Sequence, residues 1–265
     1  MDVVSRAEAA QLLMSAYESR VPVEPLTEKY AGLSLADAYQ IQLIQIGRRI
    51  EGGRRILGHK VGLTSAAMQR QLGVSQPDFG HLTDEMFLQE NAPIPAGLFL
   101  QPRIEPEVAF VLRRDLAGPG VTAAEAASAV DFVLPALELI DSRIRDWKIT
   151  LADTIADNAS SGGVVLGSRP RRLGEVDLRL GGCVLRRRAE VAGTGAGGAV
   201  LGSPLNSLIW LANTLGERGV ALRAGHVVLP GSITASVPVS PGDVFTATFT
   251  GLGSVTAVFA PEEVS

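Results

Sequence analysis

Two glutamates lie two residues apart in the segment RIEPEVAFVL, and this spacing is the sharpest chemical feature of the sequence. Side chains alternate between the faces of a β-strand, so Glu105 and Glu107 would point the same way, while Ile104 and Val108 point toward a core. Neighbouring carboxylates repel each other, and a divalent ion such as Mg²⁺ or Mn²⁺ that binds both removes this cost. The alternative is a solvent-exposed strand face that carries two acids.

A third acid, Glu138, lies in the apolar segment LPALELID. A charge in such a segment is costly unless it is paired or bound to a metal ion. Glu138 would complete a set of three carboxylate ligands and leave positions open for water and substrate. A salt bridge, with Arg143 as a candidate partner, is the other interpretation.

Four further polar residues are candidates for the same site. Lys60, in GHKVGLTS, is either an edge residue or a buried cation that orients a substrate carboxylate or acts as a base with a lowered pKa. Asp78, in SQPDFG, is either a turn residue or a general acid/base. Ser160 and Ser161, in DNASSGG, could hydrogen-bond a bound acid.

Residues 193–198 match the pattern G-x-G-x-x-G of dinucleotide-binding loops. That site needs a parallel βαβ unit and an acid about 20 residues further on, at the end of the next strand. Glu217 has the spacing but lies in or at the end of a predicted helix, and this helix begins only at Pro204. The pattern therefore does not predict a nucleotide site.

The elements that must position these residues follow from periodicity and capping signals. The first fifty residues predict two helices, one with capping-box spacing at Ser5 and Glu8 and one from Ser34 to Gly52. Further helices are predicted at 65–73, after Thr122 with Glu125 as its capping partner, and at 204–217. Strands are predicted at 56–64, 98–101, 103–113 and 131–141, around a hairpin at Gly181-Gly182, and in short runs after residue 225.

Helices dominate the start of the chain and strands the remainder, which predicts an α+β fold with a large, mostly antiparallel β-core. The change falls near residue 80. We therefore expect a mostly helical N-terminal region at 1–80, packed on a β-rich catalytic core at 81–265 as one structural unit.

Composition limits the classes of function. The 265 residues carry a formal net charge of −4 and only 5% aromatic residues, so neither a basic nor a stacking surface for nucleic acid is indicated. No apolar run is long enough to span a membrane. Cys183 is the sole cysteine, which excludes an intramolecular disulfide and a cysteine-based zinc site and fits a reducing compartment. We expect a cytoplasmic protein.

Six segments together resemble one enzyme family: GHKVGLTS, QPDFG, QPRIEPEVAFVL, PALELIDSRIRDWK, DTIADNASSG and GDVFTATFTGLGSVTAVF. They are similar to the 2-keto-4-pentenoate hydratases, which are grouped with the oxalocrotonate decarboxylases in the fumarylacetoacetate hydrolase superfamily. The resemblance extends from about residue 30 to about residue 260. It implies a mixed β-roll with peripheral helices, assembled into homo-oligomers that could associate with other enzymes of their pathway.

The resemblance also implies roles for residues that match the family motifs. The acid/base would be Lys60 or Asp78, and Ser160 would lie near the substrate carboxylate. The full expected set is Glu105, Glu107 and Glu138 as ligands of Mg²⁺ or Mn²⁺, Lys60 and Asp78 as catalytic residues, and Ser160, Ser161 and Leu72 as substrate-binding residues.

The implied reaction is the addition of water to 2-hydroxypenta-2,4-dienoate-type acids in the meta-cleavage catabolism of aromatic compounds, giving 4-hydroxy-2-oxo acids. The rival is decarboxylation of 2-oxohex-3-enedioate (4-oxalocrotonate), toward which the stretch HLTDEM leans. A decarboxylase would need a cation for the far carboxylate, and Arg70 and His81 are the candidates. A third interpretation is a non-catalytic, metal-binding partner subunit of an active relative.

Overall fold

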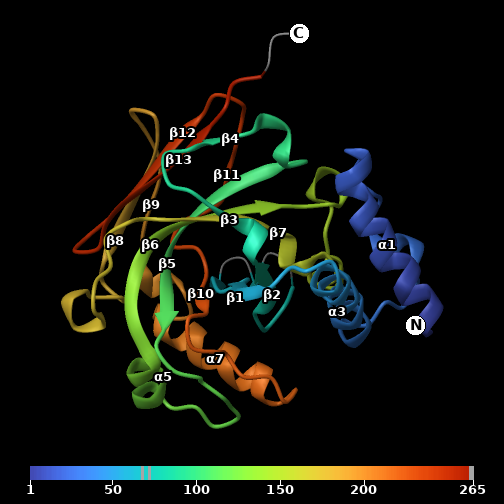
Figure 1. The fold of residues 1–265 in the computed structure, drawn as a ribbon, viewed down its shortest axis with the longest axis horizontal. Coiled ribbons are helices and arrows are strands. Elements are labelled where there is room, and N and C mark those ends of the chain that lie inside the picture. Colours follow the sequence, from blue (N-terminus) through green and yellow to red (C-terminus); the bar gives the residue numbers. More distant parts are fainter. Residues whose placement is uncertain (67–68, 71–72, 263–265) are drawn as a thin grey trace.

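A large curled sheet occupies the centre of the chain, whose computed structural model describes residues 1–66, 69–70 and 73–262 (Figure 1). The strand order is β2-β1-β10-β5-β6-β7-β3, and β11 pairs with the start of β5. Most pairs are antiparallel, but β1–β10 and β3–β7 are parallel, so the sheet is mixed. Its strands are β1 (Ile56–Gly62), β2 (Asp78–Thr83), β3 (Phe87–Leu88), β5 (Pro102–Leu112), β6 (Val130–Asp141), β7 (Ser161–Leu166), β10 (Val227–Leu229) and β11 (Val237–Pro238).

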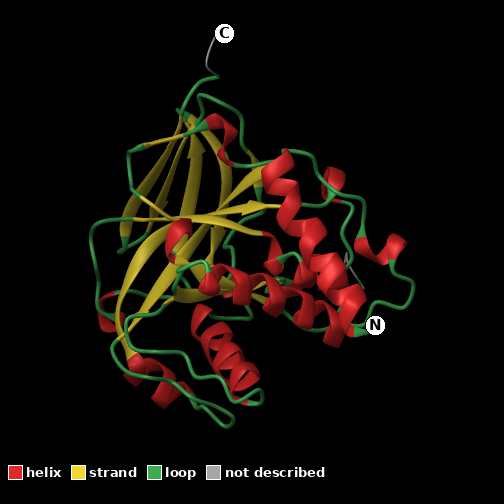
Figure 2. Cartoon of the chain, turned by 45° about the vertical axis from the view of Figure 1, so that its right-hand side comes forward, coloured by secondary structure: helices red, strands yellow, loops and turns green. Residues whose placement is uncertain are grey.

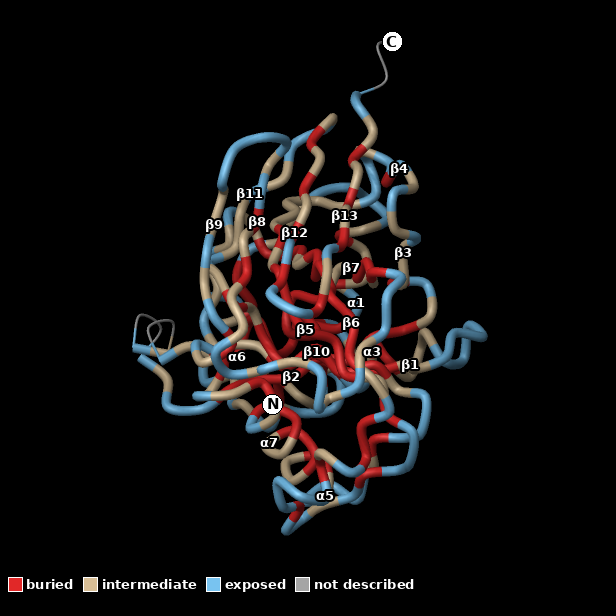
Figure 3. Tube along the Cα trace, turned by 90° about the vertical axis from the view of Figure 1, so that its left-hand side faces the viewer, coloured by how far each residue is buried: buried red, intermediate tan, exposed pale blue. Residues whose placement is uncertain are grey.

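A second sheet covers one side of the first, with the order β4-β13-β12-β8-β9. It consists of β4 (Pro93–Ile94), β8 (Gly182–Arg187), β9 (Glu190–Ala196), β12 (Val244–Phe249) and β13 (Gly253–Phe259). Phe110 and Val133 of the large sheet share one apolar core with Phe245 and Val255 of the second. Figure 3 shows the central strands β5, β6 and β10 as the most buried part of the trace.

Helices lie on the outside of the sheets (Figure 2). They are α1 (Val3–Ser19), α2 (Leu26–Lys29), α3 (Leu35–Glu51) and α6 (Leu151–Ala156) at one end, and α5 (Ala123–Ala129) and α7 (Pro204–Gly216) at the other. Gln42 and Gln45 of α3 donate hydrogen bonds to the carbonyls of Ile155 and Ala156, which fixes α6 against α3. None of the helices formed by the described residues combines the length and apolar character needed to span a bilayer.

Several local predictions are confirmed. The capping box of Ser34 and Asp37 begins α3, and that of Thr122 and Glu125 begins α5. The strands predicted at 103–113 and 131–141 are β5 and β6, and the helix after Ser203 is α7. Part of the helix predicted at 65–73 lies outside the described residues.

Three local predictions are wrong. The N-cap of α1 is Asp2, which accepts from the backbone N–H of Ser5. Residues 98–101 form no strand, because the N–H groups of Leu100 and Gln101 donate to the Asp141 carboxylate instead of to a neighbouring strand. The residues directly before Gly181 form no strand, because the Gly181 N–H closes a turn onto the carbonyl of Asp177. The hairpin lies instead between β8 and β9.

Candidate active site

Glu105, Glu107 and Glu138 meet on one face of the β5–β6 pair. Glu105 lies directly opposite Glu138 in the antiparallel register, and Glu107 follows two residues along β5 on the same face. Each of the three carboxylates offers one oxygen, and these oxygens all lie within 4.8 Å of one another. Since β5 is paired on both sides, the backbone ladder fixes the three acids in place.

Few hydrogen bonds satisfy the three carboxylates, and their ion-pair partner among the described residues is Lys60, which lies beside Glu138. Glu107 and Glu138 are buried, and Glu105 is partly exposed. Glu107 accepts one hydrogen bond of 2.8 Å from the Gly231 N–H, but its other oxygen and both oxygens of Glu138 accept none from the described residues. Burial, followed by the charge of Glu138, raises the pKa of Glu105 to about 7 and holds that of Glu107 well above its usual range. A hard divalent ion would satisfy these oxygens, so the donor set fits Mg²⁺ or Mn²⁺.

Lys60 reaches the same acids from β1. Its ammonium lies 3.1 Å from Oε1 of Glu138 and donates a hydrogen bond of 2.9 Å to the carbonyl of Ala159. Burial lowers the pKa of Lys60, but Glu138 and the other nearby acids raise it by more than burial lowers it. The pKa of Lys60 therefore lies above its ordinary value. This elevation comes from the acids themselves, so a metal ion bound to them would reduce it.

One interpretation of the sequence paired Glu138 with Arg143, and the structure shows that this pair does not form. The guanidinium of Arg143 forms a buried ion pair with Asp157 and donates to the carbonyl of Ser161 at 2.7 Å. The partner of Glu138 is instead Lys60, which is distant in sequence and is brought close by the curl of the sheet.

Asp78 lies at the start of β2, buried and opposite Gly62 of β1. A Cβ at Gly62 would stand 2.2 Å from Oδ1 of Asp78, so only glycine leaves room for this carboxyl group. Burial raises the pKa of Asp78, and the charge of Lys60 partly offsets that effect. Asp78 is therefore a buried acid on the sheet face that carries Lys60, rather than a solvent-exposed turn residue.

The short helix η4 (Asn158–Ser160) forms the wall beside Lys60. All three of its residues have positive φ, between 52° and 53°, a conformation that L-residues adopt only where their surroundings fix it. The Asn158 side chain provides this restraint by bonding the N–H and carbonyl of His81 in β2, at 2.8 and 2.9 Å. The strained turn directs the carbonyl of Ala159 at Lys60.

The predicted substrate-binding residues have different surroundings. Ser160 is buried, and its hydroxyl lies 3.2 Å from that of Thr154. The hydroxyl of Ser161 donates to the carbonyl of Asn158 at 2.6 Å and so stabilises the turn. Leu72 lies outside the described residues.

Three residues that line the site were not predicted from the sequence. Gly231 donates to Glu107, and a Cβ there would stand 2.1 Å from the Thr64 hydroxyl. Gly62 makes room for Asp78, and neither glycine carries a sequence signal of its role. Arg103 lies two residues before Glu105 on the same strand face, and the period of two that paired the glutamates could have identified it.

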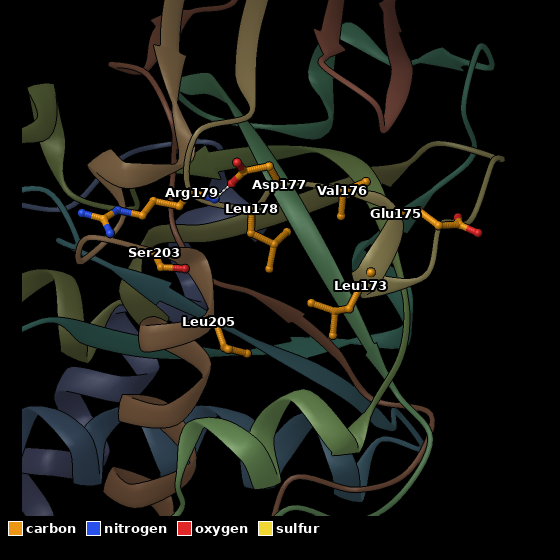
Figure 4. A pocket seen from close by; sticks show the side chains of 9 residues that line it. Leu173, Glu175, Val176, Asp177, Leu178, Arg179, Ser203 and Leu205 are labelled. Atoms are coloured by element: carbon orange, nitrogen blue, oxygen red, sulfur yellow. Dashed lines mark hydrogen bonds between the residues drawn. The ribbon is translucent and has the colours of Figure 1, made fainter.

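Two other places in the fold lack a comparable constellation. An open hollow of about 560 Å³, drawn in Figure 4, is lined by residues 173–179 with Ser203 and Leu205, none of them buried. Its Asp177 carboxylate already accepts from the N–H groups of Arg179 and Leu180. Gly193 and Gly195 of the G-x-G-x-x-G match lie in β9, antiparallel to β8, and not in the βαβ unit that a dinucleotide site requires.

Known proteins are similar to this chain along nearly its whole length. 2-Keto-4-pentenoate hydratase of Paraburkholderia xenovorans is 48% identical over 260 residues, which cover 98% of this chain and 97% of that protein. 2-Hydroxypent-2,4-dienoate hydratase of Pseudomonas putida is 46% identical over 222 residues, 83% of this chain and 100% of that protein.

A solved structure has the same fold, which confirms the predicted mixed sheet with peripheral helices. 4-Oxalocrotonate decarboxylase from Pseudomonas putida, complexed with magnesium and adipate, has a TM-score of 0.93, with 39% identity and 98% coverage of both chains. The sequence pattern described as "Fumarylacetoacetate (FAA) hydrolase C-terminal" matches residues 59–260. The chain belongs to the fumarylacetoacetate hydrolase family.

Proposed function

We propose that the chain is a metal-dependent hydratase that converts 2-hydroxypenta-2,4-dienoate-type acids (2-keto-4-pentenoate) to 4-hydroxy-2-oxo acids during meta-cleavage catabolism of aromatic compounds. The observation that carries the proposal is the set of three converging carboxylates beside a buried lysine, in which buried oxygens of Glu107 and Glu138 accept no hydrogen bond from the described residues. It occurs in a chain that is 48% identical to a 2-keto-4-pentenoate hydratase over nearly its full length.

Glu105, Glu107 and Glu138 would hold Mg²⁺ or Mn²⁺ in this proposal. The solved decarboxylase relative is complexed with magnesium, and three carboxylates suit a hard ion. When bound, the ion supplies a Lewis acid for the 2-oxygen and the neighbouring carboxylate of the acid. The Gly231 N–H keeps Glu107 oriented for this task.

Hydration requires four proton movements: loss from the 2-hydroxyl, addition at C5, loss from the water that attacks C4, and addition at C3. Asp78 is our candidate for the group that shuttles these protons, since its raised pKa lets it exist in both protonation states closer to neutral pH. Lys60 keeps its proton and provides positive charge toward the enolate that forms when the 2-hydroxyl ionises. Ser160 would bind the substrate carboxylate, with Ser161 and Leu72 as further substrate-binding residues.

Decarboxylation of 4-oxalocrotonate is the second candidate, favoured by the solved relative with a TM-score of 0.93. It needs a cation for the far carboxylate of the substrate. His81 does not fit that role, because burial lowers its pKa to about 4 and leaves it neutral at physiological pH. Arg70 is exposed and remains a candidate.

The purified chain, supplied with Mg²⁺ or Mn²⁺, separates these functions. Absorbance loss from 2-hydroxypenta-2,4-dienoate with formation of 4-hydroxy-2-oxopentanoate supports the hydratase, whereas carbon dioxide release from 2-oxohex-3-enedioate alone supports the decarboxylase. Metal binding with neither reaction would favour a non-catalytic partner subunit.

The cellular setting belongs to the same proposal. We infer a cytoplasmic homo-oligomer that could associate with other pathway enzymes, with the regions 1–80 and 81–265 folding as one unit. Cys183 is a buried free thiol, which fits a reducing compartment. Light scattering on the purified chain tests the oligomer, with a monomer mass as the contradicting result.

A further inference from the structure

Arg103 stands at the open end of the row of acids. It lies two residues before Glu105 on β5, so the two side chains leave the same strand face roughly 7 Å apart. Exposure increases along this face from Glu107, which is buried, to Glu105 and Arg103, which are partly exposed. Arg103 therefore lies at the less buried end of this row of side chains.

The guanidinium of Arg103 has no acceptor among the residues that the structure describes. Its Nε is buried without a hydrogen bond. The guanidinium lies over the ring of Trp147, with 5.6 Å between the guanidinium carbon and the ring centroid. Arg143 and Arg187, in contrast, each pair with an aspartate. Nε of Arg171 is buried without a hydrogen bond as well, but Arg103 lies on the strand face that carries Glu105 and Glu107, so its unpaired donor points to a ligand of that site.

Trp147 is held over Arg103 by a network based on Gln101. The indole donates to the Gln101 carbonyl at 3.1 Å, and the Gln101 side chain binds the carbonyls of Ser142 and Ile144 at 3.0 and 2.9 Å. Asp146 and Trp147 both have positive φ, 55° and 56°, a conformation kept only where neighbours impose it. The ring therefore presents the arginine fork in a fixed orientation.

The charges around the site also favour a role for Arg103 in binding an anion. A bound divalent ion and the Lys60 ammonium would offset the charges of the three glutamates, and Asp78 adds a further acid, so Arg103 supplies the positive charge that an incoming anion needs. The planar guanidinium matches a carboxylate with two parallel hydrogen bonds. We propose that Arg103 binds a carboxylate of the acid held at the three-glutamate site, an inference that rests on the proposed function.

The carboxylate could be the one on C1 or the far one of a diacid, and binding of two unreactive acids distinguishes them. Pyruvate carries only the first kind and adipate both, and each is titrated into the Mg²⁺-loaded protein by calorimetry. Arg103→Gln should weaken binding roughly 10- to 100-fold, the loss expected for hydrogen bonds to a charged group. Loss for both acids indicates the C1 carboxylate, and loss for adipate alone indicates the far one.

Three controls separate recognition from a structural effect. Arg103→Lys should recover part of the affinity, because it keeps the charge but not the fork. Arg187→Gln removes another ring-stacked arginine, far from the site in the second sheet, and should leave binding unchanged. Mg²⁺ affinity in Arg103→Gln should be no weaker than in the wild type.

Turnover gives an independent reading. On the hydratase substrate, Arg103→Gln should raise KM more than it lowers kcat if the C1 carboxylate is bound. Unchanged affinity for both pyruvate and adipate would overturn the proposal. Because binding is measured apart from turnover, a wild-type chain that binds these acids but hydrates nothing would contradict the proposed function and leave the role of Arg103 testable.

Discussion

Glu107 is the least exposed of the three acids, and its contacts bear on its proposed role as a metal ligand. One oxygen accepts the Gly231 N–H, and the other has no partner among the described residues. Burial and two neighbouring acids hold its pKa well above the usual range. Without a cation the group therefore favours its protonated form, and a metal ion must compete with that proton.

Glu107→Gln should lower metal-dependent turnover by more than about 100-fold while the chain stays folded. The amide keeps an oxygen for the Gly231 N–H but loses the charge that binds the metal. Mn²⁺ should raise the melting temperature of the wild type and not that of the variant, because only an ion that binds the folded state stabilises it. Steady-state kinetics and thermal unfolding measure both effects.

Glu190→Gln, on the exposed strand β9, is the matched control and should behave as the wild type. Full activity in Glu107→Gln would remove the metal-site assignment.

Single site residues could be predicted from the sequence where the pattern of one strand determines the direction of the side chain. The period of two placed Glu105 and Glu107 on one face, and the apolar surroundings of Glu138 indicated a buried charge with a partner. It failed for that partner, because Arg143 is near in sequence but Lys60 is near in space.

At the scale of elements, the close approach of β1 and β2 positions the proposed acid/base. Gly62→Ala would bring a Cβ to 2.2 Å from Oδ1 of Asp78, so the carboxyl group must move. We expect kcat to fall by about 10-fold or more, since a small misplacement of a reacting group is costly. Metal affinity should hardly change, because the three glutamates lie on other strands.

Gly47→Ala is the matched control for this substitution. Nothing lies within 4 Å of a Cβ at Gly47, which is inside α3, so the variant should keep full activity. Unchanged kcat in Gly62→Ala would show that the position of Asp78 does not limit the reaction.

The same pair of strands carries two buried histidines, His59 and His81, on the face opposite Lys60, and the partly exposed His226 lies beside them just before β10. The His59 ring lies 4.9 Å from that of His81 and 5.8 Å from that of His226, measured between centroids. Burial lowers the pKa of His81 to about 4 and lowers that of His59 well below 6.5. The folded chain therefore binds fewer protons here than the unfolded chain below pH about 6.5.

The free energy of unfolding contributed by these histidines should consequently decline as pH falls from about 6.5 toward about 4. His59→Leu should show a smaller decline than the wild type in urea unfolding at pH about 7.5 and about 5. The acids of the active site are common to both proteins, so the difference between the curves isolates the imidazole. Parallel curves would contradict the assignment.

Element prediction was most accurate where local signals and tertiary structure agree. The capping boxes of α3 and α5 and the long strands β5 and β6 are of this kind. The predicted strand at 98–101 was wrong because Asp141, distant in sequence, captures the backbone N–H groups there. No local pattern could reveal that contact.

At the scale of the whole molecule, the change from helices to strands predicted the α+β class, but not the pairing of the strands. β1 and β2 lie before residue 84 and belong to the same sheet as β5 and β6. The parallel pairing of β1 with β10 joins segments separated by more than half of the chain. This long-range pairing brings Lys60 to Glu138 and makes the site a property of the complete fold.

The central claim is that three glutamates from β5 and β6 hold the metal ion at which the acid is transformed. Crystals grown with Mn²⁺ and measured near the manganese absorption edge test it directly. The account predicts an anomalous peak about 2 Å from one oxygen each of Glu105, Glu107 and Glu138, and its loss in Glu107→Gln. A wild-type enzyme that hydrates the dienoate with no peak there, or with its ion bound elsewhere, would contradict the account.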